Sequence, residues 1–118
     1  MRKYETIFIL DPGLDETTWD KEIKKVEELI ENHKGIIIQA ERWGLRRLSY
    51  QIKKKNEGYY VLIQFEAPLP LIQELDRYYK LNENCLRFLI VLLREESELL
   101  KKDKESSSIG GSKEKVEI

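Results

Sequence analysis

The stretch YYVLIQFE, Tyr59–Glu66, carries apolar or aromatic side chains at both alternating sets of positions. Because neighbouring side chains of a strand point to opposite faces, this pattern predicts a strand at the centre of a sheet, partly buried on both sides. One face would hold Tyr59, Val61, Ile63 and Phe65. The opposite face would hold Tyr60, Leu62, Gln64 and Glu66.

Three further segments have the β-branched and aromatic composition typical of strands. They lie at Lys3–Leu10, Ile36–Trp43 and Cys85–Glu95. Leu45–Lys54 either continues the second strand or turns back as a hairpin, with a bulge or bend at Gly44. Lys55–Gly58, with its asparagine and glycine, is expected to be a turn.

Apolar residues spaced three or four apart predict helices over residues 16–33 and 69–80. Asp15 or Thr17 is expected to cap the first helix, and Gly35 suits its C-terminal end. The order strand, helix, strand, strand, helix, strand predicts an α+β fold of the ferredoxin-like, split βαβ type. Right-handed crossovers would place both helices on one face of a four-stranded antiparallel sheet, in the spatial order two, three, one, four.

The 118 residues suggest one domain, which we place at residues 1–96. Residues 97–118 have few apolar side chains, a serine run and a Gly-Gly pair, and are expected to form a polar, flexible tail.

The two predicted helices cover only one face of the sheet, so the apolar side chains on the other face must be shielded from water in another way. The tail or a long second strand would cover it, or the face would bind a protein or RNA partner.

The segment RWGLRRLSYQIKKK, Arg42–Lys55, holds six basic side chains and no acidic one. The whole chain has a net charge of −1, so the remainder carries −7. In a regular strand Arg47, Ser49, Gln51 and Lys53 would point one way, opposite to Leu48, Tyr50 and Ile52. This charge favours an anionic partner, because arginine matches phosphate bidentately. The alternative is a lysine-rich edge strand that prevents aggregation. Basic residues at positions 2 and 3 would add to the cluster if the first strand begins nearby.

Nothing in the sequence indicates an enzyme, a cofactor, a metal or a small-molecule substrate. His33, the single histidine, is expected to cap a helix, and Cys85, the single cysteine, to be a small buried side chain. No phosphate-binding glycine motif, dinucleotide motif or zinc-ligand set is present. No apolar run is long enough for a membrane helix, and the N-terminus does not resemble a signal peptide, which together with the single cysteine suggests an intracellular location.

An RNA-recognition motif shares the predicted element order and uses aromatic side chains of its central strand for base stacking. Gly58 and Tyr59 fit that pattern, whereas Tyr60 and Val61 do not. Base stacking on the sheet is therefore an alternative to phosphate binding by the basic segment. A protein–protein module that forms homo-oligomers, or a ligand-sensing domain, would have the same topology.

GLRRLSYQIK, Gly44–Lys53, resembles the signature decamer of the bacterial small-subunit ribosomal protein six family. Every constrained position of that pattern is matched. The opening MRKYETIFILDPGLD is similar to the start of the family, with a basic pair, an apolar strand and an Asp-Pro turn. The resemblance extends over roughly residues 1–95.

The resemblance implies a non-catalytic structural protein of the cytoplasmic ribosome. Family members bind the central domain of small-subunit ribosomal RNA together with small-subunit ribosomal protein eighteen, as a heterodimer. Motif position then indicates Arg2, Arg46, Arg47 and Lys53 as RNA- or partner-binding residues. Lys54 and Lys55 are added from their charge alone. Gly44 is expected to meet a backbone requirement, and Leu48 and Ile52 to pack against the domain.

Overall fold

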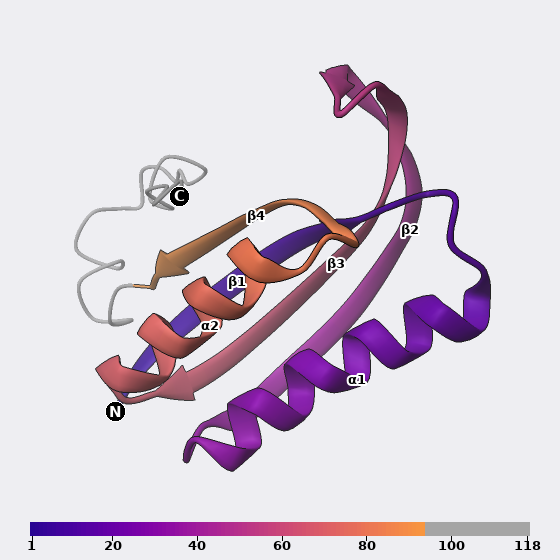
Figure 1. Ribbon diagram of the computed structural model, residues 1–118. Helices are drawn as coiled ribbons and strands as arrows, with labels where there is room; N and C mark the ends of the chain where they lie inside the picture. Colours follow the sequence, from indigo (N-terminus) through magenta and orange to yellow (C-terminus); the bar gives the residue numbers. More distant parts are fainter. Residues whose placement is uncertain (94–118) are drawn as a thin grey trace.

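The computed structural model describes residues 1–93, and the expected tail at 97–118 lies outside the described residues. Four strands form one sheet in the order β2-β3-β1-β4, and both neighbours of β1 pair with it in antiparallel fashion, as β2 does with β3. Figure 1 shows α1 and α2 side by side on one face of this sheet. The predicted fold class, topology and placement of the helices are confirmed.

The element bounds agree with the predicted segments to within a few residues, except at the β2–β3 turn. The strands are β1 Arg2–Leu10, β2 Ile36–Ile52, β3 Lys55–Ala67 and β4 Cys85–Leu92, and the helices are α1 Glu16–Asn32 and α2 Leu69–Leu81. Neither helix in this part of the chain is long and apolar enough to cross a membrane.

Local chemistry explains both ends of α1. The carboxylate of Asp15 accepts a hydrogen bond from the backbone N–H of Thr18 at 2.8 Å, which lowers the pKa of Asp15. At the other end Nδ1 of His33 lies 2.9 Å from the carbonyl oxygen of Leu29, so the predicted capping role of His33 is confirmed. Gly35 lies just beyond this end of the helix. A larger residue would not fit there, because a Cβ would lie 2.7 Å from atoms of Ile30 and of Leu71.

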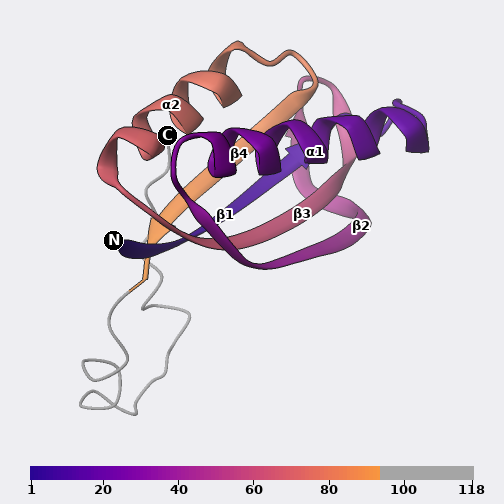
Figure 2. The same cartoon turned by 90° about the horizontal axis from the view of Figure 1, so that it is seen from below.

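The core lies between the helices and the sheet (Figure 2). It contains Tyr4, Phe8, Leu10, Ile23, Val26, Ile30, Val61, Ile63, Phe65, Leu71, Leu75, Tyr79 and Ile90. The register places Tyr4 beside Phe65, and Phe8 beside Val61, which puts the apolar set predicted for one face of β3 against the helices. Two polar groups inside this layer are satisfied, since the hydroxyls of Thr6 and Tyr79 lie 2.9 Å apart.

A buried carboxylate joins α1 to the loop before β4. The side-chain amides of Asn82 and Asn84 each donate to Glu22 at 2.8 Å, and the Tyr78 hydroxyl donates at 3.3 Å. Burial alone would raise the pKa of Glu22, but these hydrogen bonds and the charge of Lys25 outweigh it, and the net pKa is lowered.

The expected turn at Lys55–Gly58 is wrong. The chain reverses at Lys53 and Lys54, which both have positive φ, 53° and 66°, between the paired residues Ile52 and Lys55. This is a two-residue hairpin turn of the mirror-image type, which usually takes asparagine and glycine. Gly58 lies instead within β3, where a Cβ would come 2.2 Å from Cγ2 of Ile9.

The long strand β2 is continuous, and three irregularities in its pairing with β3 bend it. They fall between Ile37 and Gln39, between Arg42 and Gly44, and between Arg47 and Ile52. Gly44 has a φ of 84°, which fits the bulge expected at this residue. We call residues 46–57 the hairpin end, the part of β2 and β3 that projects past the rest of the sheet in Figure 1.

Candidate nucleic-acid interface

Two basic residues of the segment Arg42–Lys55 form ion pairs with carboxylates of the same domain. Arg42 Nη1 donates to Asp20 Oδ1 on α1 at 2.5 Å, and this hydrogen bond raises the pKa of Arg42. Lys55 forms an ion pair with Asp11 at 3.3 Å, which ties the hairpin end to the turn after β1. None of the ion pairs among residues 1–93 includes Arg46, Arg47, Lys53 or Lys54. These four exposed cations therefore give the hairpin end its uncompensated positive charge.

Arg46 and Arg47 point to opposite sides of the hairpin. Arg46 pairs in register with Gly58 and Arg47 with Glu57, so successive positions alternate between the faces. Arg46 lies on the sheet face without helices, where its guanidinium carbon is 5.3 Å from the centre of the Trp43 ring. Trp43 in turn stacks with Tyr60 at a centroid distance of 6.3 Å. This face thus presents a cation, an indole and a phenol in one row.

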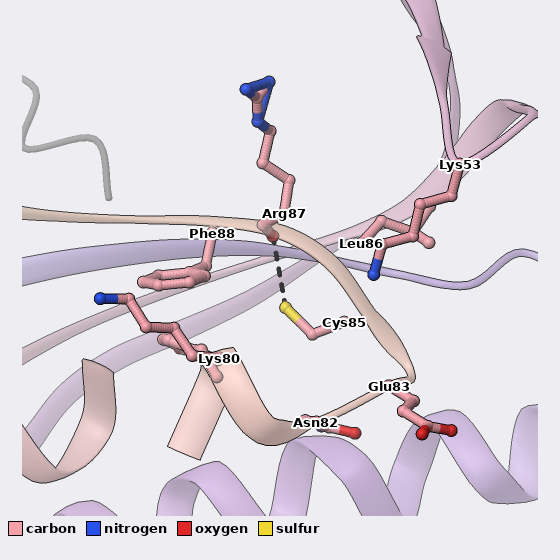
Figure 3. Close-up of a pocket in the computed structure, with 9 residues that line it drawn as sticks. Lys53, Lys80, Asn82, Glu83, Cys85, Leu86, Arg87 and Phe88 are labelled. Atoms are coloured by element: carbon pink, nitrogen blue, oxygen red, sulfur yellow. Dashed lines mark hydrogen bonds between the residues drawn. The ribbon is translucent and has the colours of Figure 1, made fainter. Parts of the chain in front are cut away.

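The tip of the hairpin bends over the open sheet face toward β4. Arg87 of β4 donates to the Tyr50 hydroxyl at 2.6 Å, and its guanidinium carbon lies 5.9 Å from the Tyr50 ring centre. Figure 3 shows Lys53 extending from the hairpin toward Leu86, where it lines a hollow with Cys85 and Arg87. The end of β2 therefore covers part of the open face. This agrees with the alternative in which a long second strand covers that face.

Lys53 and Arg47 do not share a face, which corrects the expectation from simple alternation. Arg47 lines a different hollow, together with Pro12, Lys54, Lys55, Asn56 and Glu57. The pairing irregularity between Arg47 and Ile52 and the positive φ of both turn lysines break the alternation. The basic segment consequently divides its charge between two sides of the hairpin.

Arg2 lies away from this cluster. It is exposed and pairs in register with Ala67, whereas the hairpin end adjoins the other end of β1, where Leu10 pairs with Tyr59. A strand rises about 3.3 Å per residue, so roughly 25 Å separates the two ends of β1. The idea that residues 2 and 3 extend the basic cluster is wrong, because β1 ends near the hairpin instead of beginning there.

The aromatic residues of β3 are used on different faces. Tyr59 stacks on Trp19 of α1 at 4.0 Å between centroids and is not available for base stacking on the open face. Tyr60 lies on the open face with Leu62, which is 7% exposed, and Ile9, which is 8% exposed. The open face carries apolar and aromatic side chains as predicted, but Glu5 and Gln64 also lie on it, joined by a 3.4 Å hydrogen bond. Its centre is less exposed than the pattern of side chains suggested.

Sequence reasoning missed Arg87 and gave Trp43 no role. A usable signal existed for Arg87, because it is the one charged residue in the apolar stretch CLRFLIVLL. Cys85 is buried, as predicted, and its thiol lies 3.4 Å from the carbonyl oxygen of Arg87 (Figure 3). Burial raises the pKa of Cys85 to about 12, so the thiol stays protonated at neutral pH.

These features define a class: a two-layer split βαβ domain with exposed cations and aromatic side chains on a long hairpin. The sequence matches the family profile described as ribosomal protein S6 over residues 3–92. A small ribosomal subunit protein bS6 of Clostridium kluyveri is 48% identical over 91 residues, covering 77% of this chain and 96% of the relative. The Clostridium botulinum protein of the same name is 43% identical, covering 77% and 97%.

A crystal structure of 30S ribosomal protein S6 from Thermotoga maritima superposes with a TM-score of 0.76. It has 34% sequence identity and covers 86% of this chain and 92% of its own. The chain belongs to the ribosomal protein S6 family, whose members are structural proteins of the small ribosomal subunit. This membership confirms that the chain is a ribosomal protein and not an enzyme, with the cytoplasmic ribosome as its location.

Proposed function

We propose that this protein binds the central domain of small-subunit ribosomal RNA together with small-subunit ribosomal protein eighteen, as a heterodimer. The observation that carries the proposal is the hairpin end, where Arg46, Arg47, Lys53 and Lys54 are exposed without carboxylate partners among residues 1–93. Arginine and lysine bind phosphate through charge-assisted hydrogen bonds and release counterions, so affinity should fall as salt rises. Arg2 and Lys55 complete the proposed set of RNA- or partner-binding residues.

The open sheet face supports the protein half of the proposal. Trp43 is 36% exposed there and lies beside Tyr60 and Arg46, residue types that are enriched in protein interfaces. Stable protein contacts bury about 800 Å² on each partner. RNA and protein would then be bound at adjoining surfaces of one rigid domain.

Filter binding to a ribosomal RNA fragment tests the RNA half, with and without the partner protein, across a salt series. We expect affinity to fall steeply with salt and to drop for the double variant Arg46→Ala, Arg47→Ala. Affinity that is indifferent both to salt and to this variant would contradict the RNA contact. A pull-down from lysate, with and without ribonuclease, shows whether RNA retains the protein on the ribosome.

Self-association is the second candidate use of the apolar surface. Ile36 and Ile38 at the outer strand β2 are 53% and 48% exposed, which favours a protein contact at this edge. The mass of the free protein in size-exclusion chromatography separates the two uses. A monomer supports binding of a different protein, and a stable homodimer supports self-association.

A further inference from the structure

We infer that the hollow beside Arg47, on the side of the hairpin that faces away from the open sheet face, is a binding site for a phosphate of a nucleic-acid backbone. Arg47, Lys54, Lys55 and Asn56 would provide the donors. The inference rests on the proposed function and refines it, because it separates the phosphate-binding cations from the remaining exposed ones.

The surroundings of the two neighbouring arginines differ. The guanidinium of Arg46 lies over the Trp43 ring at 5.3 Å, an arrangement that satisfies one of its faces with an indole. Arg47 has no ring contact, ion pair or side-chain hydrogen bond within residues 1–93, and it lines a hollow that contains two lysines. A planar guanidinium with free donors is the group that binds phosphate through two hydrogen bonds.

The two lysines of the β2–β3 turn lie on different sides of the hairpin. Lys53 lines the hollow next to Cys85 and Arg87, and Lys54 lines the hollow next to Arg47. Both residues have positive φ, a conformation that non-glycine residues rarely adopt. A lysine pair at positions that favour asparagine and glycine is an observed strain, and its effect is to place Lys54 beside Arg47.

Lys55 and Asn56, which also line the hollow, are held in position by neighbouring side chains. Asp11 holds Lys55 at 3.3 Å, and the backbone N–H of Gly13 donates to the same carboxylate at 2.8 Å. Gln51 donates to Oδ1 of Asn56 at 3.1 Å, which fixes the Asn56 amide. Its Nδ2 group makes no hydrogen bond to another described side chain and remains available to donate to a phosphate oxygen.

Glu57 also lines the hollow and opposes an anion. It faces Arg47 across the β2–β3 pair, yet the two side chains form no ion pair. Asp11 also compensates Lys55, so three cations stand against two carboxylates and the hollow keeps a net positive charge. Removal of the Glu57 charge should therefore strengthen anion binding, which gives the inference a test in the direction opposite to that of Arg47.

Filter binding of the full chain to the ribosomal RNA fragment, repeated at several salt concentrations, tests the site. We expect Arg47→Ala and Lys54→Ala each to weaken binding about tenfold and to reduce the slope of log affinity against log salt by about 1. Glu57→Gln should tighten binding. Arg77→Ala, which removes an exposed cation from α2, is the matched control and should change neither quantity. A loss for Arg46→Ala equal to that for Arg47→Ala, or no effect of Glu57→Gln, would overturn the site.

A second measurement separates this inference from the proposed function. The isotope-labelled full chain is titrated with a short RNA duplex of arbitrary sequence, and the signals of the Arg47 Nε–H and Asn56 Nδ2 groups are followed. Shifts confined to this hollow support the site even if the ribosomal RNA fragment is not bound, an outcome that would contradict the proposed function alone. Shifts centred on Arg46 and Trp43, or no shifts, would contradict the phosphate site itself.

Discussion

The same two strands, β2 and β3, build two regions with different physical support. In the body of the sheet β3 is buried between α1, α2 and the neighbouring strands, with Val61, Ile63 and Phe65 in the core. The hairpin end has no such layer and is fastened by a few contacts, chiefly those of Lys55 with Asp11 and of Tyr50 with Arg87. Stability should therefore depend on the body and nucleic-acid binding on the hairpin end.

The largest effect should come from the body. Phe8→Ala removes a ring that is 1% exposed and packs 5.4 Å from Tyr79, and we expect the free energy of unfolding to fall by about 3–5 kcal/mol. Chemical denaturation measures it. For the molecules that remain folded, the salt dependence of RNA binding should not change, and a changed slope would show that the two regions are coupled.

Gly58→Ala tests the point where the two regions meet. A Cβ there would lie 2.2 Å from Cγ2 of Ile9, so we expect a loss of about 2 kcal/mol from overpacking. The double variant Ile9→Ala, Gly58→Ala removes the clashing atom. It should show less than the sum of the two single losses, as measured by a denaturation cycle. Simple additivity of the two losses would argue against this contact.

Glu22→Gln tests the polar link between α1 and the loop before β4. The folded protein lowers the pKa of Glu22, so its ionised form favours folding. That contribution is complete above the ordinary carboxyl pKa and is lost as the pH falls through the lower, folded value. We expect the variant to lose about 1.5 kcal/mol at neutral pH, because amide replaces carboxylate opposite Asn82 and Asn84. Unfolding measured down to acid pH should show a shallower loss than in the unmodified protein.

The smallest effect on stability, and one of opposite sign, should come from the tip. Replacing Lys53 and Lys54 by asparagine and glycine removes strain at two positive φ values, and we expect the free energy of unfolding to rise by about 1 kcal/mol. RNA affinity should fall at the same time, because the tip loses two cations. A variant that gains stability and keeps its affinity would show that the turn lysines do not bind RNA.

The strands and helices of the body could be predicted from the sequence because burial of one face makes apolar residues recur at regular spacing along the chain. Tyr59–Glu66 alternates between faces, and Ile23, Val26 and Ile30 recur at helical spacing, so both patterns report which side is covered. The hairpin turn could not be predicted, since its residues carry no turn chemistry. Gly58, which suggested a turn, is required by the close approach of Ile9, a contact between strands that no local pattern reveals.

The candidate interface was predictable in composition but not in arrangement. The charge of Arg42–Lys55 is evident in the sequence, yet Arg42 and Lys55 proved to be tied to Asp20 and Asp11. Separation of Lys53 from Arg47 depends on a pairing irregularity that alternation cannot anticipate. Arg2 matched the family pattern, but only the strand register shows that it lies at the far end of β1.

The buried thiol of Cys85 supplies a reporter that requires no added label. With a pKa of about 12 it is almost entirely un-ionised at neutral pH, and alkylating reagents attack the thiolate. Modification of the native protein should proceed only through molecules that have opened at the start of β4. The rate of alkylation therefore reports how often the start of β4 opens. Because Cys85 lines a hollow together with Lys53 of the hairpin, a ligand bound at the hairpin tip should slow this opening.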